Sequence, residues 1–224
     1  MNVLAFSDVH SSARAENVIT ALVREHRPDV VAIAGDLTDP GRPDTAVRLL
    51  ESIPVTTLVV PGNMDDARAA AAFSAGKAVN IHLKKHIVAG VAFVGLGGWI
   101  ASPSAHEKWG IRPDDAEARL ARIMPEGAVL LTHVPPYGHL DAVPVPDAFS
   151  SGRGEVEHIG SPHVRRLVDR FKPVLVISGH VHESRGIERE GDTLYVNPGP
   201  ARDGFGAVIE LKGQARAELL TFSP

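Results

Sequence analysis

Seven side chains of the types that bind metal ions follow short apolar segments of this sequence. They are aspartates, an asparagine and histidines, namely Asp8, His10, Asp36, Asn63, His133, His180 and His182. Carboxylate and amide oxygens combined with imidazole nitrogens, without sulfur, form a ligand set that suits Mn, Fe, Zn, Co or Ni rather than Ca or Cu(I). The residue types therefore predict a transition-metal site.

Each of these signals is weak when it is taken alone. An aspartate after a strand, such as Asp8, is usually the cap of the next helix. A single histidine such as His133 is more often a packed or solvated residue than a ligand. The spacing adds information, because Asp8 and His10 are two residues apart, as are His180 and His182. The order and the repeated spacing favour one shared site.

The elements that must position these side chains alternate along the chain. Short runs of β-branched and aliphatic residues predict buried strands at residues 3–6, 30–34, 56–60, 129–131 and 174–177. Amphipathic segments between them predict helices at residues 16–27, 45–53, 65–75, 114–124 and 162–172. Ligands bind at the carboxyl ends of strands in open α/β sheets, so we expect the seven side chains to share one crevice.

A second kind of strand is indicated in the middle of the chain and near its C-terminal end. Turn residues between short strand candidates predict hairpins within residues 86–94, 186–196 and 206–222. We therefore expect an α/β fold, of mixed α+β character, in which two mixed β-sheets pack as a sandwich with helices on the outer faces. A chain of 224 residues fits one domain, spanning 1–224.

One connection is unusually long for a compact domain. Residues 134–160 are rich in Pro, Gly and His, and we expect this loop to form part of the rim of the site. His139 and Arg153 lie in it and are candidate contacts for a substrate phosphate, the alternative being solvated loop side chains. Trp99 and Trp109 are candidates for stacking on a base, although core packing is the better interpretation of Trp99.

Taken together, the motifs resemble those of the calcineurin-like metallophosphoesterases. The matching segments are Asp8-x-His10, Gly35-Asp36, Gly62-Asn63, Thr132-His133 and Gly179-His180-Val181-His182. The resemblance covers essentially the whole chain, which is most similar to the small single-domain bacterial and archaeal phosphodiesterases. It implies a dinuclear metal-dependent phosphoric ester hydrolase, in which a hydroxide bridging two divalent ions attacks phosphorus in line.

The resemblance also implies a role for each ligand. One ion would be held by Asp8, His10, Asp36 and His182, and the other by Asp36, Asn63, His133 and His180. Asp36 would bridge the two ions, and Asp36, Asn63 and His133 are the expected catalytic residues. Manganese is the expected metal, with Fe, Zn, Co or Ni as alternatives.

Two residues beside the asparagine motif carry further expectations. Many relatives have a histidine directly after Gly-Asn, whereas this chain has Met64, which carries no ionisable proton. General-acid catalysis from this position is therefore not expected. Asp65 is either a residue that orients a neighbouring ligand or a helix cap.

Composition narrows the class of substrate. The formal net charge is −4, no cysteine is present, and no basic stripe of the kind that binds nucleic acid is apparent. No run approaches the ~20 apolar residues of a membrane helix. We expect a cytoplasmic protein that acts on a small-molecule phosphate ester, most simply a phosphodiester, with no nucleic-acid or membrane partner and an open oligomeric state. The alternatives are a phosphomonoesterase acting on a small molecule or phosphoprotein, and a catalytically silent interaction scaffold with the same fold.

Overall fold

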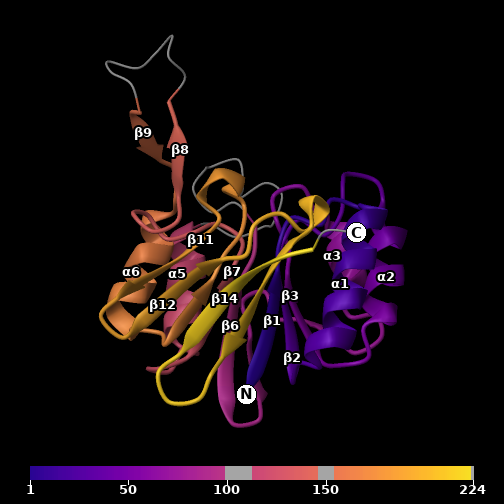
Figure 1. Cartoon of the computed structure of the whole chain (residues 1–224). Helices are drawn as coiled ribbons and strands as arrows, with labels where there is room; N and C mark the ends of the chain where they lie inside the picture. Colours follow the sequence, from indigo (N-terminus) through magenta and orange to yellow (C-terminus); the bar gives the residue numbers. More distant parts are fainter. Residues whose placement is uncertain (99–112, 146–153, 223–224) are drawn as a thin grey trace.

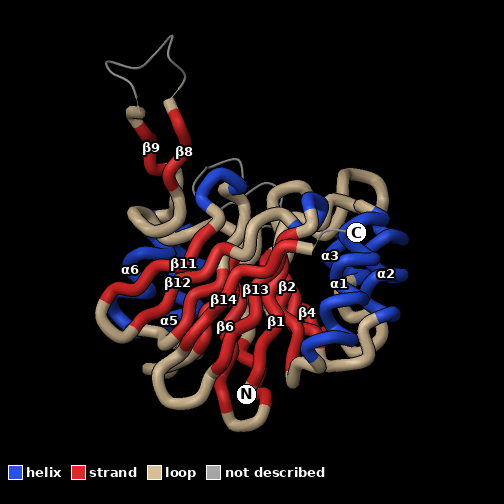
Figure 2. The backbone as a smooth tube through the Cα atoms, in the orientation of Figure 1, coloured by secondary structure: helices blue, strands red, loops and turns tan. Residues whose placement is uncertain are grey.

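Two mixed β-sheets lie face to face, with helices on the outer side of each (Figures 1 and 2). The structure is a computed structural model that describes residues 1–98, 113–145 and 154–222. Trp99, Trp109 and Arg153 lie outside the described residues, so the expectations for these three side chains have no structural counterpart here.

The first sheet carries six strands in the order β14-β13-β1-β2-β3-β4. Their bounds are β1 Asn2–Phe6, β2 Val30–Ala34, β3 Thr57–Val60, β4 Ala78–Asn80, β13 Phe205–Glu210 and β14 Arg216–Thr221. The strands β1 to β4 run parallel, and β13 and β14 extend the sheet in antiparallel fashion. Three helices cover its outer face, α1 Ala13–His26, α2 Pro43–Ser52 and α3 Ala67–Ala72 (Figure 1).

The second sheet also has six strands, in the order β11-β12-β10-β7-β6-β5. Their bounds are β5 Lys85–Val88, β6 Val91–Leu96, β7 Val129–Thr132, β10 Leu175–Ile177, β11 Gly186–Glu190 and β12 Thr193–Asn197. The four inner strands run parallel, and β5 and β11 are antiparallel edges. The helices α5 Pro113–Ala121 and α6 Pro162–Phe171 pack on its outer face.

Successive side chains of each strand point to opposite faces of its sheet, and the buried ones form three apolar layers. In β1, Val3 and Ala5 face the second sheet, whereas Leu4 and Phe6 pack under the helices of the first. A strand that is covered on both faces must be apolar at every position, which is why the buried strands were recognisable as continuous apolar runs. The expected sandwich of two mixed sheets is confirmed.

The predicted elements agree with the structure in most places. All five buried strands are confirmed to within one residue at each end, and the three predicted hairpins are β5–β6, β11–β12 and β13–β14. The helix predicted at 65–75 is wrong in extent, because α3 spans only Ala67–Ala72. It begins late because the carboxylate of Asp66 caps it, accepting from the amides of Arg68 and Ala69 at 2.9 and 2.8 Å. The short strand β4 was not predicted.

The long connection 134–160 is not wholly irregular. It contains β8 Ala142–Pro144 and β9 Val156–His158, which pair as an antiparallel ribbon that projects from the body (Figure 1). Its base is tied to the short 3₁₀ helix η1 His182–Ser184, since Ser184 Oγ donates to the Ala142 carbonyl at 2.7 Å. Within the described ranges, no helix is both long and apolar enough to cross a membrane.

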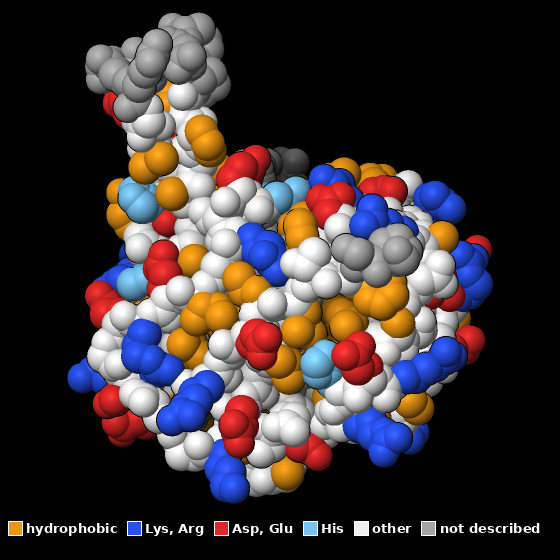
Figure 3. Space-filling model, viewed as in Figure 1, with side chains coloured by type: hydrophobic (Ala, Val, Ile, Leu, Met, Phe, Trp, Pro, Cys, Tyr) orange, Lys and Arg blue, Asp and Glu red, His pale blue; other side chains and the backbone are white. Residues whose placement is uncertain are grey.

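Charged side chains of both signs cover the face of the molecule that Figure 3 shows. On this face the described lysines and arginines are interspersed with aspartates and glutamates and do not gather into a continuous stripe. A mixed surface of this kind is ordinary for a chain with a small net charge. The expectation that nucleic acid is not a partner stays a prediction.

Candidate metal centre

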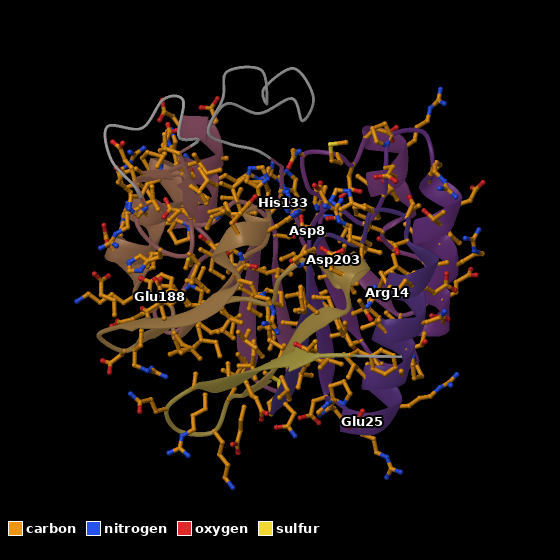
Figure 4. The ribbon with its side chains drawn as sticks, turned by 45° about the horizontal axis from the view of Figure 1, so that its top comes forward. Asp8, Arg14, Glu25, His133, Glu188 and Asp203 are labelled. Carbon is orange, nitrogen blue, oxygen red and sulfur yellow. The ribbon has the colours of Figure 1, made fainter. Side chains whose placement is uncertain are left out.

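The parallel strands of both sheets deliver polar residues to one edge of the sandwich. Asp8 and His10 follow β1, Asp36 follows β2, Asn63 follows β3, His133 follows β7, and His180 and His182 follow β10. Figure 4 shows Asp8 and His133, which come from different sheets, next to each other at the centre of this edge. The structure brings all seven predicted residues together.

Asp8, His10 and His182 form the first group of potential ligands. His182 Nε2 lies 3.2 Å and His10 Nε2 3.9 Å from Asp8 Oδ1. Asp39 orients the ring of His10 through the other ring nitrogen, since His10 Nδ1 lies 3.2 Å from Asp39 Oδ1. A carboxylate behind a metal-binding imidazole fixes the tautomer and directs the other ring nitrogen toward the metal.

Asp36, Asn63, His133 and His180 form the second group. Asn63 Oδ1 lies 2.8 Å from His133 Nε2 and 2.9 Å from His180 Nδ1. Asp36 Oδ2 is 3.5 Å from His133 Nε2 and 3.8 Å from His10 Nε2, which belongs to the first group. Asp36 therefore lies between the two groups, which is the position the bridging role needs, and Asp8 also has a ligand atom within 4.8 Å of those of Asp36 and His133.

Unpartnered ligand atoms show that these residues fit metal ions. His10 Nε2 is buried and has no hydrogen-bond partner among the described residues, and neither has Asp8 Oδ1, whose contact with His182 Nε2 at 3.2 Å lacks hydrogen-bond geometry. Buried polar atoms are rarely left in this state, because each forfeits the hydration it had in the unfolded chain. His133 Nδ1 lies 2.7 Å from the Ala34 carbonyl, which can only accept, so this nitrogen carries a proton and Nε2 is the nitrogen that faces the site.

The electrostatics of the site also favour cations. Burial alone would raise the pKa of Asp8, but the imidazoles of His182 and His133 outweigh it and hold that pKa at about 2. Burial opposes a charge on His133 as well, yet the carboxylates of Asp36 and Asp8 raise its pKa above the ordinary value. Burial and the neighbouring His133 lower the pKa of His180 to about 4, so this imidazole is neutral at pH 7. Two buried carboxylates among several imidazoles form a site that stabilises positive charge.

The backbone at the ligands is strained. Asp8, His10, Asp36 and His180 have φ values of 53°, 50°, 50° and 67°, in the left-handed region that residues with a Cβ seldom adopt. Such conformations cost about 1–3 kcal/mol each and are typical of functional sites. The four residues turn the chain sharply where a strand ends, and this turn directs each side chain into the shared crevice.

Gly62 provides room for the central carboxylate. A Cβ added at this position would lie 2.0 Å from Asp36 Oδ1 and 2.3 Å from the Asp36 amide nitrogen. No ordinary side chain fits, so the loop that carries Asn63 approaches Asp36 closely only because residue 62 is glycine. The amide of Met64, one residue after Asn63, then donates to Asp36 Oδ1 at 2.7 Å.

Asp65 joins two of the ligand loops, and it is not a helix cap. Its Oδ1 accepts from the amide and hydroxyl of Thr38, both at 2.8 Å, and its Oδ2 accepts from the amides of Leu37 at 3.2 Å and Gly62 at 2.8 Å. Burial and the charge of Asp36 raise the pKa of Asp65, against the hydrogen bonds from Gly62 and Thr38. Because each oxygen already accepts two hydrogen bonds, the donors favour the ionised carboxylate.

His139 is not brought to the metal ligands. Its ring stacks on Tyr195 with the centroids 3.9 Å apart, its Nδ1 lies 3.1 Å from Glu188 Oε2, and its Nε2 contacts Arg165. Tyr195 packs with the core under α5 and α6, on the outer face of the second sheet. Among the contacts of the described residues, none joins His139 to a ligand, so the structure gives no support to the expected phosphate contact.

Two residues that sequence reasoning did not select lie against the ligands. Asp39 orients His10, and Arg202 Nη2 lies 3.3 Å from His182 Nδ1. Asp39 could have been selected from the sequence, because it is a carboxylate three residues after Asp36. Arg202 carries no local signal, because it follows β12 in a segment without any ligand motif.

A third group of potential ligands, Asp114, Glu117 and His163, lies where α5 contacts α6. It already holds a cation, because Arg166 Nη2 lies 2.7 Å from Glu117 Oε2. Arg166 and His163 lower the pKa of this glutamate, against the opposing effect of burial. The group is an ion-pair network between two helices and does not resemble the centre described above.

The sequence and the fold of this chain are similar to those of several known proteins. A model of the calcineurin-like phosphoesterase family matches residues 1–184. An uncharacterized protein of Methanocaldococcus jannaschii is 26% identical over 211 residues, which cover 89% of this chain and 88% of the relative. The crystal structure of TT1561 of Thermus thermophilus is similar with a TM-score of 0.75 and 22% identity over 98% of both chains. A protein described as a novel archaeal phosphodiesterase is similar with a TM-score of 0.56 and 12% identity, over 98% of this chain and 100% of that one.

Proposed function

The chain belongs to the calcineurin-like phosphoesterase family, and on that premise we propose that it hydrolyses a phosphodiester with the help of two divalent transition-metal ions. The observation that carries the proposal is the position of Asp36, whose Oδ2 lies 3.8 Å from His10 Nε2 and 3.5 Å from His133 Nε2. One carboxylate oxygen thus faces a ligand of each group, as a residue shared by two ions must.

The residues of the chain have distinct tasks in this proposal. Asp8, His10 and His182 would hold one ion, Asn63, His133 and His180 would hold the other, and Asp36 would be shared by both. When bound, two such ions lower the pKa of water between them and offset the charge that develops on the phosphoryl oxygens. The buried and hydrogen-bonded surroundings keep the ligands in place, so little reorganisation accompanies the reaction.

Met64 favours a diester over a monoester as the substrate. A positioned acid that protonates the leaving oxygen contributes about 10²–10⁴-fold to such reactions. Met64 has no proton to donate, and His139 is held on the outer face of the second sheet. Esters with good leaving groups, such as aryl diesters, are therefore expected to react best. The similarity to an archaeal phosphodiesterase, although it is one of fold, agrees with this choice.

The test is a panel of phosphomonoesters and phosphodiesters offered to the metal-stripped chain with and without added Mn²⁺. We expect Mn²⁺-dependent hydrolysis in which aryl diesters react faster than alkyl monoesters. Faster hydrolysis of alkyl monoesters would replace the diester assignment by a phosphomonoesterase. Metal binding without hydrolysis of any ester would favour the interaction scaffold.

A further inference from the structure

Arg202 lies directly beside the candidate metal centre. Its short 3₁₀ helix, η2 Ala201–Asp203, follows β12, and its backbone amide donates to the Asp8 carbonyl at 3.4 Å. The preceding amide, of Ala201, donates to the Ser7 carbonyl at 2.8 Å. Figure 4 shows Asp203, the residue after Arg202, next to Asp8. The backbone of Arg202 is thus fixed against the strand end that carries the first ligands.

The turn that leads to Arg202 is also braced against the loop of the last ligands. Asn197 Nδ2 donates to the Val181 carbonyl at 2.8 Å, and Asn197 Oδ1 accepts from the amide of Gly199 at 3.0 Å. Val181 lies between His180 and His182 in the chain. The position of Arg202 is therefore set from two sides by the ligand loops themselves.

Among the described residues, no carboxylate lies within ion-pair distance of the Arg202 guanidinium. The ion pairs of these residues are formed by other arginines and by histidines. Its contact in the site is His182 Nδ1, at 3.3 Å. A guanidinium has only donors, so His182 Nδ1 must accept. If His182 held a metal through Nε2, its proton would lie on Nδ1, and the ring would then offer Arg202 no acceptor.

The side chain of Arg202 is exposed, and a positive charge beside two divalent cations is unfavourable unless an anion lies between them. Arginine is also the side chain whose donors best match phosphate oxygens. From these contacts we propose that Arg202 binds a non-bridging phosphoryl oxygen of the substrate. This inference rests on the proposed function and adds to it a substrate-contacting residue outside the metal ligands.

Binding of inorganic phosphate to the Mn²⁺-loaded chain tests this proposal without relying on turnover. The variants are Arg202→Gln, Arg202→Lys and the matched control Arg48→Gln, which removes the same charge from an exposed position on α2. Calorimetry gives the Kd of phosphate, and elemental analysis of the same samples gives the bound metal. The KM and kcat for an aryl diester are measured in parallel.

We expect Arg202→Gln to weaken phosphate binding about 10- to 100-fold, the usual range for one hydrogen bond to a charged group, and to raise KM. Arg202→Lys should recover part of this loss, because it restores the charge but not the planar donors. Arg48→Gln should match the wild type, and all variants should keep their metal content.

Two results would overturn the assignment of Arg202. One is wild-type phosphate affinity in metal-loaded Arg202→Gln, and the other is loss of metal from that variant, which would mean that Arg202 supports His182 instead of substrate. Failure of the wild-type chain to bind metal would contradict the proposed function itself, and the metal analysis separates that case from the first two.

Discussion

Replacement of Asp65 by asparagine tests whether one buried carboxylate holds the two central ligand loops together. Asparagine has nearly the same shape but keeps only one acceptor oxygen. If that oxygen takes the place of Oδ1 and keeps both bonds from Thr38, the amide NH₂ faces the backbone N–H groups of Leu37 and Gly62. Two buried donors then lose their acceptor.

The size of the effect follows from these contacts. A hydrogen bond to a charged group contributes about 1.5–3 kcal/mol, and two such losses that share one site should cost roughly 2–4 kcal/mol because the site can relax in part. For a chain of this length, 1 kcal/mol corresponds to about 2–4 °C in Tm. We therefore expect Asp65→Asn to lower Tm by roughly 5–15 °C. Metal affinity should fall about 10- to 100-fold, because the residues that position Asp36 and Asn63 are released.

Thermal unfolding of the metal-stripped protein and Mn²⁺ titration measure the two effects separately. Asp66→Asn is the matched control, since it removes the same charge one residue away while asparagine caps a helix as well as aspartate does. Its Tm should shift by about 1 °C or less. If Asp65→Asn unfolds at the temperature of the control and binds Mn²⁺ as tightly as the wild type, the proposed bracing of the two loops is wrong.

Four further variants probe the centre and its surroundings. Asp36→Asn should lose at least one ion and nearly all activity, because less negative charge then lies between two cations; wild-type turnover would refute the shared carboxylate. Gly62→Ala should also weaken metal binding, since its Cβ would lie 2.0 Å from Asp36 Oδ1, and unchanged affinity on titration would show that the loop yields easily. Met64→His should flatten the dependence of rate on leaving-group pKa, whereas His139→Ala should leave it unchanged; a slope that steepens in His139→Ala would mean that His139 supplies the proton.

The grouping of the candidate metal ligands was predictable because each is encoded by local sequence. A buried strand is recognisable as an apolar run, and the polar residue that follows it must emerge at the carboxyl end. His10 and His182 needed only the spacing to Asp8 and His180 in addition. The fold was predictable for the same reason, since the strands that set the order of the ligands are the most regular segments of the chain.

The residues around the ligands depend on tertiary contacts that local sequence does not encode. Asp65 bonds to groups 27 and 28 residues earlier in the chain, so its role could not be separated from that of a helix cap by sequence alone. His139 lies in a loop that favours a role at the rim, yet its ring stacks on Tyr195, more than fifty positions later. Arg202 reaches His182 only because β12 runs parallel to β10 and returns the chain to the same edge.

Hydrolysis of an aryl phosphodiester by the metal-stripped chain, followed while Mn²⁺ is added and bound metal is counted, tests the central claim most directly. The geometry around Asp36 predicts no turnover without metal and a rise in rate that saturates when about two ions per chain are bound. Turnover that survives removal of metal would contradict the account, as would binding of less than about one ion per chain under every condition.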